Sequence, residues 1–454
     1  MGQERDRLRA VLAVLAVAMM LAWPAMLNGY AIVFSDTYAF IDQASRPLMV
    51  WDKPWTYGPF LLALHGRTTL WLPVAGQALI LSHLLSLLAA SRGAATPLRH
   101  LLLGALLAIG SAAPWFAGLL MPDIFAPIAA IALYLLAFPG ALGPWQRRWL
   151  AVLATMAIAF HLAHLVLAAG CLVVILLLTP RALPRTALPL GLALAILAIT
   201  NLAGHGRLAI SPYGSVHALA RMVGDGNVTP VLARACPAVG WHLCAWKDRL
   251  PNDSDTFLWS PDGPVASHPG HAIGAIGFAP EAAVIVGHVL REEPLGVLRA
   301  ALANTGRQLL RTGLGDTLGS DWLDVTVQTA LRAYFPPEEQ ARFLAALQIN
   351  RTLPALATPF APLHTTLLLL GTASGAALLL RRADRNFALL VLAALLANAF
   401  ATGTLSGPHD RYQARIAWLV LLPGALAVLR SVPAPRPRPE TSEPTARSRS
   451  AESR

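Results

Sequence analysis

Two aspartates in short polar segments could carry acid–base chemistry at a membrane surface. Asp36, in FSDTYAF, follows the first apolar run, and Asp123, in MPDIF, lies between two later runs. A carboxylate at a membrane boundary can accept the proton of a hydroxyl group that acts as a nucleophile. Either residue could instead cap the helix that follows it, because Asp is a frequent N-cap residue. We take Asp36 as the candidate general base and Asp123 as a candidate substrate-binding residue.

A second set of polar residues could bind an anion. His409, Arg411 and Tyr412 lie in SGPHDRYQARIAWLVLLP, directly before the last apolar run. An Arg guanidinium pairs with a phosphate through two parallel hydrogen bonds. Tyr and Arg in this position could also serve only as anchors at the membrane interface. We expect these three residues to contact substrate.

Two histidines lie in the middle of a long apolar run. His161 and His164 are three residues apart, so they share one face of a helix. They could contact a phosphate or bind a metal ion, but such a pair without a third ligand is a poor zinc motif. A hydrogen-bonded histidine pair at a helical turn explains them equally well. The sequence therefore indicates no metal site, and any cofactor is unknown.

Composition indicates that membrane-spanning helices position these residues. The chain has 454 residues, of which 56% are hydrophobic and 13% are charged, and its mean hydropathy is +0.55. Soluble domains carry about twice this share of charge, and apolar runs of about 20 residues are typical of transmembrane helices. The net charge of +11 comes largely from Arg in short loops and the C-terminal tail. We therefore expect membrane lipid as a partner and no nucleic acid.

Arginines mark every second connection between the apolar runs. They precede the first run and recur at 92–99, 147–148, 181–185 and 381–385. By the positive-inside rule these connections face the cytoplasm, and the candidate residues then face outward. The pattern requires the run Trp149–Leu178 to form a hairpin of two helices, since one tilted helix would invert every later loop. We expect ten spans with cytoplasmic termini in a bacterial inner membrane, with the working face in the periplasm.

The expected fold is an all-α polytopic membrane protein with a mainly helical or irregular external domain. Its regions are an N-terminal membrane domain at 1–203 with a first external loop at 30–70, an external domain at 204–361, C-terminal membrane helices at 362–431 and a disordered cytoplasmic tail at 432–454.

The external segment contains two cysteines that could form a disulfide. Cys236 and Cys244 lie in CPAVGWHLC, and an oxidising compartment favours a bridge between them. Two free thiols are the alternative. A bridge requires their Cα atoms to lie within about 7 Å.

The order of these parts resembles the GT-C superfamily of polyprenyl-phosphate-sugar-dependent membrane glycosyltransferases, which includes protein mannosyltransferases and aminoarabinose transferases. The similar segments are SDTYAF, WTYGPFLLAL, MPDIFAPIAAIALYLLAF and HDRYQARIAWLVLLP. The resemblance covers the membrane portion. This chain has SDT where the family has a paired Asp-Glu, and its large external segment has no counterpart there.

The resemblance implies transfer of a sugar from a lipid-linked donor to an external hydroxyl, with Asp36 as general base. Arg411, together with His161 or His164, would stabilise the phosphate leaving group. A transporter or flippase, or a non-catalytic membrane scaffold, are the alternative functions. Transporters usually place ionisable residues at mid-membrane, where these runs hold essentially no carboxylate. Convergence of Asp36 and Arg411 would favour an enzyme, and their separation would favour a scaffold.

Overall fold

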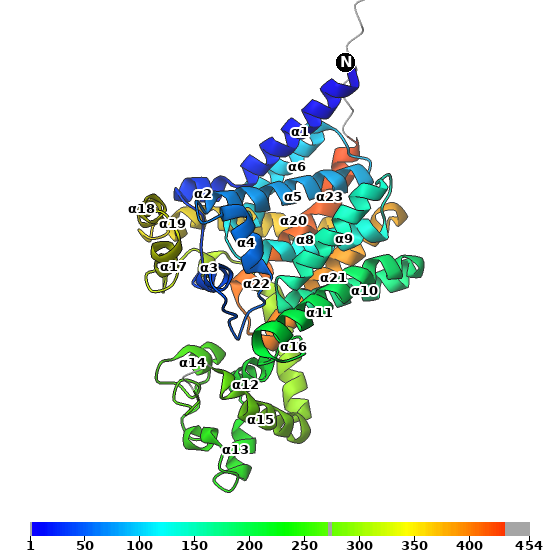
Figure 1. The fold of residues 1–454 in the computed structure, drawn as a ribbon. Coiled ribbons are helices and arrows are strands. Elements are labelled where there is room, and N and C mark those ends of the chain that lie inside the picture. Colours follow the sequence, from blue (N-terminus) through cyan, green and yellow to red (C-terminus); the bar gives the residue numbers. More distant parts are fainter. Residues whose placement is uncertain (1, 271–274, 432–454) are drawn as a thin grey trace, which may run out of the picture.

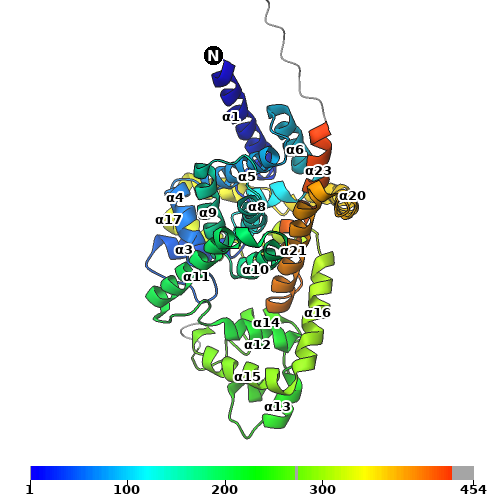
Figure 2. The same cartoon turned by 90° about the vertical axis from the view of Figure 1, so that its right-hand side faces the viewer.

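The computed structural model describes residues 2–270 and 275–431, and their regular secondary structure consists of helices. Within these residues the only β-type pairing is an isolated bridge between Ile32 and Leu119. The tail expected to be disordered, 432–454, lies outside the described residues. Both described ends of the chain lie on the side of the molecule opposite to the green helices α12–α15 (Figures 1 and 2).

The N-terminal half forms most of a tightly packed apolar body. Its helices are α1 (Gly2–Leu21), α2 (Trp23–Asn28), α3 (Thr37–Ser45), α4 (Tyr57–His65), α5 (Trp71–Ser91), α6 (Pro97–Gly110), α7 (Ala113–Gly118), η1 (Pro122–Ile124), α8 (Phe125–Ala137), α9 (Pro144–Ala159), α10 (Leu162–Leu178), η2 (Pro180–Ala182) and α11 (Leu183–His205). All residues of α8 are buried, so this helix is the centre of the body.

The C-terminal half supplies a separate helical unit and the last helices of the body. Its helices are α12 (Gly214–Gly224), α13 (Thr229–Ala235), η3 (His242–Trp246), α14 (Ser254–Trp259), α15 (Ala279–Glu292), α16 (Pro294–Leu310), η5 (Gly315–Thr317), α17 (Val327–Tyr334), α18 (Pro337–Ala345), α19 (Leu353–Ala357), η6 (Thr358–Phe360), α20 (Ala361–Leu378), α21 (Arg382–Leu405), α22 (Asp410–Ala417), η7 (Trp418–Val420) and α23 (Leu421–Ser431).

Five helical stretches among the described residues are long and apolar enough to cross a membrane. They are Trp71–Ser91, Pro180–His205, Leu353–Leu378, Asp384–Leu405 and Asp410–Ser431. Three shorter apolar helices accompany them: Pro97–Gly110, Pro122–Ala137 and Leu162–Leu178. Large apolar side chains on the outside of this body are exposed, among them Leu177 and Leu369. Such a surface suits lipid rather than water.

Two apolar runs are broken into separate helices. The run Trp149–Leu178 ends one helix at Ala159 and begins the next at Leu162, so it forms two helices rather than one long one. The apolar stretch from His100 to Leu119 is also divided, because Ser111 interrupts it between α6 and α7. The Ser111 hydroxyl donates to the Leu107 carbonyl and accepts from the Ala113 amide, which satisfies backbone groups at the break.

Residues 213–289 form a compact unit with its own core, which we call the α12–α15 module. Val216, Phe257, Phe278 and Ile285 are among its fully buried side chains. Cys236 and Cys244 form a disulfide within it, with their Cα atoms 5.5 Å apart, which is the pairing expected from the sequence.

Helix α16 leaves this module and packs along α21 of the body (Figure 2). The contact is close at Gly403, where a Cβ atom would lie 2.7 Å from the Asn304 carbonyl oxygen. Glycine is therefore required for this packing.

Residues 323–349, which include α17 and α18, pack on the first loop (residues 30–70) instead of on the module. The Tyr30 hydroxyl donates to Glu339 at 2.6 Å, and the Tyr334 hydroxyl donates to Asp42 at 2.6 Å. Gln348 bonds both backbone groups of Val33, at 3.1 and 2.7 Å. The segment expected as one domain at 204–361 thus contributes to three separate buried clusters, one of which is the main core of the body.

Candidate functional site

Asp36 precedes α3 but does not cap it. Its side chain makes no capping hydrogen bond and lies 3.3 Å from the ammonium of Lys53, which also pairs with Asp52. Burial alone would lower the pKa of Lys53, but the two carboxylates outweigh it and hold that pKa above its ordinary value. Thr37, the first residue of α3, accepts the Phe34 amide and donates to the Leu120 carbonyl, each at 3.0 Å, which ties the start of the helix to another segment. The Asp36 carboxylate therefore remains partly exposed beside a cation.

Asp123 is not a helix cap either. It lies in η1, and its side chain is only 1% exposed. Its Oδ1 atom is 3.4 Å from both Arg411 Nε and Arg415 Nη1, and its Oδ2 atom has no hydrogen-bond partner. The sequence therefore places a buried carboxylate between two guanidinium groups.

The two arginines are four residues apart on α22 and so lie on one face of the helix. Arg415 is fully buried and donates to Asn398 Oδ1 at 2.9 and 3.3 Å. The Arg411 guanidinium lies 4.4 Å from the ring centre of Phe34, two residues before Asp36. Its Nε atom is buried without a hydrogen-bond partner. The structure thus brings the Asp36 loop and the Arg411 helix together.

The buried cluster holds two guanidinium groups around one carboxylate. Arg411 and Arg415 both contact Asp123, and the charges of Asp36 and Asp316 act on Arg411 as well. Because Arg411 Nε is buried without a hydrogen-bond partner, the cluster has capacity to bind an anion. The ring of Tyr412 lies 5.1 and 5.5 Å from the two guanidinium carbons and lines the same place. The Tyr412 hydroxyl is 3.1 Å from Ser406 Oγ.

The histidine pair lies at the start of α10. His161 Nδ1 accepts the Ala163 amide at 3.2 Å and caps the helix, and His164 Nδ1 is 2.7 Å from the Ala157 carbonyl oxygen. These bonds occupy one nitrogen of each ring. This agrees with the alternative that the two histidines form a hydrogen-bonded pair at a helical turn. His164 Nε2 is buried without a partner, and the charge of Arg415 acts on both rings.

Residues of distant segments fix the first turn of α22. Asp316 accepts the backbone amide of Arg411 at 3.0 and 3.2 Å. His409 lies before the helix, and its Nε2 atom is 3.4 Å from Asp255 Oδ2 of the α12–α15 module. The hydrogen bond to His409 lowers the pKa of Asp255. Gln308 of α16 exchanges hydrogen bonds of 2.8 and 3.0 Å with the backbone of His409. The position of Arg411 therefore depends on contacts with the module and with α16.

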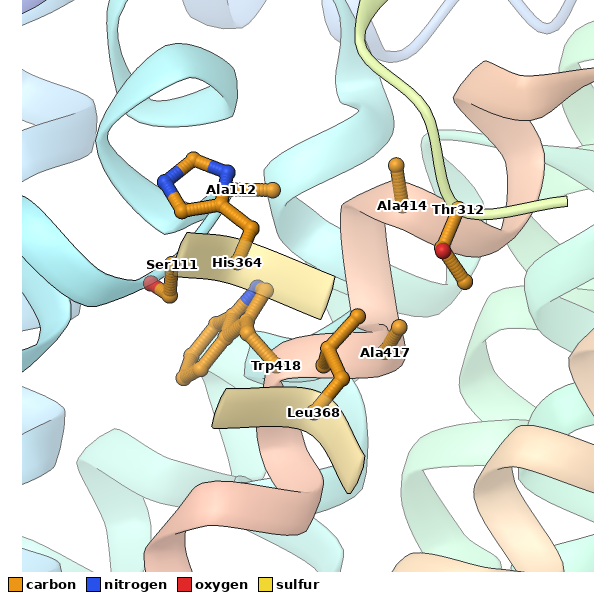
Figure 3. A pocket seen from close by; sticks show the side chains of 8 residues that line it. All are labelled: Ser111, Ala112, Thr312, His364, Leu368, Ala414, Ala417 and Trp418. Carbon is orange, nitrogen blue, oxygen red and sulfur yellow. The ribbon is translucent and has the colours of Figure 1, made fainter. Parts of the chain in front are cut away.

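A small pocket lies on the other side of α22. Figure 3 shows the side chains that line it: Ser111, Ala112, Thr312, His364, Leu368, Ala414, Ala417 and Trp418. Its wall is largely apolar, and Arg411 and Arg415 do not line it. The pocket is a gap in the packing between α7, α20 and α22, and no charged side chain lines it.

The part of the chain that the structure describes contains no group of three His, Cys, Asp or Glu residues able to hold a metal ion. The site consists of carboxylates, guanidinium groups, one ammonium group and imidazoles. Such a set can accept a proton and neutralise an anion.

Several residues of this site were not among the candidates from the sequence. Lys53 is one of only two lysines in the chain, and that rarity is a signal that could have pointed to it. Asn398 is a lone amide side chain within an apolar run, and its isolation is a second signal that could have pointed to the site. Asp316 offers no such signal, because only the fold brings it to the Arg411 amide.

The chain matches no protein-family model and shows no significant similarity to a curated protein or to a solved structure.

Proposed function

We propose that this protein is an integral-membrane glycosyltransferase that moves a sugar from a polyprenyl-phosphate donor to an acceptor hydroxyl. The observation that carries the proposal is that the loop of a partly exposed carboxylate, Asp36, lies against a buried cluster of two arginines and one aspartate, through the contact of Phe34 with Arg411. A base and an anion site close to each other are what inverting sugar transfer from a phosphate requires.

The reaction assigns a role to each group. Asp36 takes the proton of the acceptor hydroxyl, and the hydroxyl oxygen attacks the anomeric carbon of the donor. The bond between that carbon and the phosphate oxygen breaks, and polyprenyl phosphate leaves with the electron pair. Arg411 stabilises the charge that develops on the phosphate, while Arg415 is held by Asn398 and positions Asp123. The charge of Arg415 acts on both histidine rings, and we assign them a supporting contact with the same phosphate.

The membrane arrangement proposed here has ten crossings. They are α1, α5, α6 with α7, α8, α9, α10, α11, α20, α21, and α22 with α23. An even number agrees with the two described chain ends lying on one side of the molecule (Figure 1), and the Arg-rich connections place that side in the cytoplasm. Asp36, Arg411 and the α12–α15 module then face the periplasm of a bacterial inner membrane.

Asp36→Asn tests the proposal directly. Asn keeps the size and polarity of the side chain but cannot take the proton, so transfer from radiolabelled polyprenyl-phosphate sugars in membranes should be abolished while the protein level is unchanged. Asp52→Asn is the matched control, because it also removes a carboxylate from Lys53. Transfer by Asp36→Asn at the wild-type rate would refute the assignment of the base.

A further inference from the structure

Three aromatic side chains meet where the first loop contacts the α12–α15 module, beside the site described above. The ring of Trp51 from the first loop stacks on His217 of α12, with centres 5.1 Å apart and planes at 20°. The ring of Trp259, at the end of α14, lies 5.8 Å from Trp51. The proposed transfer reaction leaves all three without a role.

This aromatic cluster adjoins the proposed base through one side chain. The Lys53 ammonium lies 6.0 Å from the ring centre of Trp259 and 3.3 Å from Asp36 Oδ1. The Trp259 ring is 53% exposed, although a Trp of this size gains most from burial. An exposed aromatic face that adjoins a charged site is a common feature of ligand-binding surfaces.

His217 carries an unpaired polar atom in this cluster. Its Nε2 atom is buried and has no hydrogen-bond partner. Buried polar atoms in folded proteins are nearly always paired, so such an atom points to a ligand or to a catalytic role. Burial lowers the pKa of His217, and the charges of Asp52, Lys53, Asp255 and Asp36 all act on it. A neutral imidazole can exchange a hydrogen bond with a hydroxyl group.

We propose that this cluster is the acceptor subsite and that the acceptor is a carbohydrate. A sugar ring has apolar C–H faces that pack on Trp259 and Trp51, and hydroxyl groups on its edge that His217 Nε2 can bind. Lys53 lies between Trp259 and Asp36. A sugar ring held on Trp259 presents another of its hydroxyl groups to Asp36. The transfer step itself rests on the function proposed above, but the binding of the sugar does not.

Chemistry favours a sugar over a peptide acceptor at this place. Flat aromatic surfaces with one or two polar atoms at their edge match a ring that is apolar on its faces and polar around its rim. A peptide is usually recognised by backbone hydrogen bonds to a strand edge or by a groove for an amphipathic helix. The described residues of the cluster belong to a loop and to two helix segments and provide no strand edge.

Binding of soluble oligosaccharides to the purified full-length protein tests the proposal. The probes are linear hexasaccharides of α-(1→4)-glucan, β-(1→4)-glucan and α-(1→6)-mannan, with a Ser/Thr-containing decapeptide for comparison. We expect at least one hexasaccharide to bind and the decapeptide not to bind. Trp259→Ala and His217→Phe should each weaken binding by about tenfold, the scale of a lost aromatic contact or polar partner.

Two controls separate this proposal from its alternatives. Trp145→Ala removes a Trp that is 76% exposed at the start of α9, and it should leave binding unchanged. Asp36→Asn should retain sugar binding even where transfer is lost, so failure of the subsite and failure of the transferase proposal give different results. Absence of binding by all three hexasaccharides, binding of the peptide alone, or equal effects of Trp259→Ala and Trp145→Ala would overturn the carbohydrate subsite.

Discussion

The apolar body holds two clusters in which a buried aspartate contacts two arginines, and they differ in how completely their charges are paired. At the end near the chain termini, Asp384 Oδ1 accepts hydrogen bonds from both Arg92 and Arg430. Arg92 also donates to the Tyr134 hydroxyl at 3.1 Å. At the end that faces the α12–α15 module, the members are Asp123, Arg411 and Arg415.

The second cluster is looser in geometry. Asp123 Oδ1 lies 3.4 Å from each arginine, and two polar atoms, Asp123 Oδ2 and Arg411 Nε, have no hydrogen-bond partner. Both clusters have the same formal charge, so composition does not explain the difference. A well-paired cluster joins helices, here α5, α21 and α23. A cluster with free hydrogen-bonding capacity can take up an additional anion. The degree of pairing, and not the number of arginines, therefore distinguishes a cluster that joins helices from one that can bind an anion.

The largest expected effect comes from removing the carboxylate of the well-paired cluster. Asp384→Ala leaves two guanidinium groups without their shared partner and should cost about 3–5 kcal/mol of stability. Thermal unfolding of the purified protein in detergent measures the loss, with the exposed Arg381→Ala as a control that should be near wild type. If the variant is as stable as wild type, this cluster does not stabilise the packing of the three helices.

The next effect is a difference in response to inorganic phosphate. Phosphate should stabilise the wild-type protein through the Asp123 cluster, by about 1.4 kcal/mol at ten times its dissociation constant. Arg411→Ala should lose this stabilisation, whereas Arg430→Ala, in the other cluster, should keep it. The midpoint of thermal unfolding with and without phosphate checks both. An equal loss in the two variants would remove the distinction between the clusters.

A smaller effect is expected for the residue that fixes the Arg411 backbone. Asp316→Ala removes the acceptor for the first turn of α22 and should cost about 1 kcal/mol, together with a higher phosphate concentration for half-maximal stabilisation. Asp316→Asn keeps an acceptor oxygen and should restore most of the phosphate response. A shift in stability without any change in the phosphate response would show that Asp316 supports the fold but not the site.

The smallest effect concerns the contact between Asp255 and His409. Asp255 is about half exposed, so Asp255→Asn should cost no more than about 1 kcal/mol. Because the folded-state pKa of Asp255 is lowered, its contribution is complete above the unfolded value of about 3.9 and is lost as the pH falls through the folded value. Unfolding midpoints of wild type and variant should differ at pH 5 and converge towards pH 3. Divergence at lower pH would contradict the assigned direction.

The sequence predicted those parts of the molecule that a regular pattern specifies. Apolar runs of helical length gave the helical class, and the division of Trp149–Leu178 into two helices followed from the charges of its neighbouring loops. Asp36 and Arg411 could be placed on one side, because the loops that carry them alternate with the Arg-rich ones. The sequence left open whether the two would converge, and the structure brings their segments together through the contact of Arg411 with Phe34.

Other contacts had no pattern in the sequence. Asp316 and Arg411 are 95 residues apart and meet only through the fold. His217 belongs to an ordinary amphipathic helix, and its position beside Trp51 depends on how the module sits on the first loop. An aspartate before a helix can cap the helix or pair with a cation, and the outcome depends on which cation the fold brings near it. For Asp36 that cation is Lys53.

The hydrogen bonds between Gln348 and Val33 have a consequence for biosynthesis. They join residues 315 positions apart, so the loop that carries Asp36 cannot reach its final form until the ribosome has made nearly four-fifths of the chain. At roughly 5–20 residues per second, that loop waits on the order of 15–60 s after its own synthesis. A nascent chain of this protein therefore emerges with Asp36 not yet in its final surroundings, and these surroundings form only after the late segment has been made.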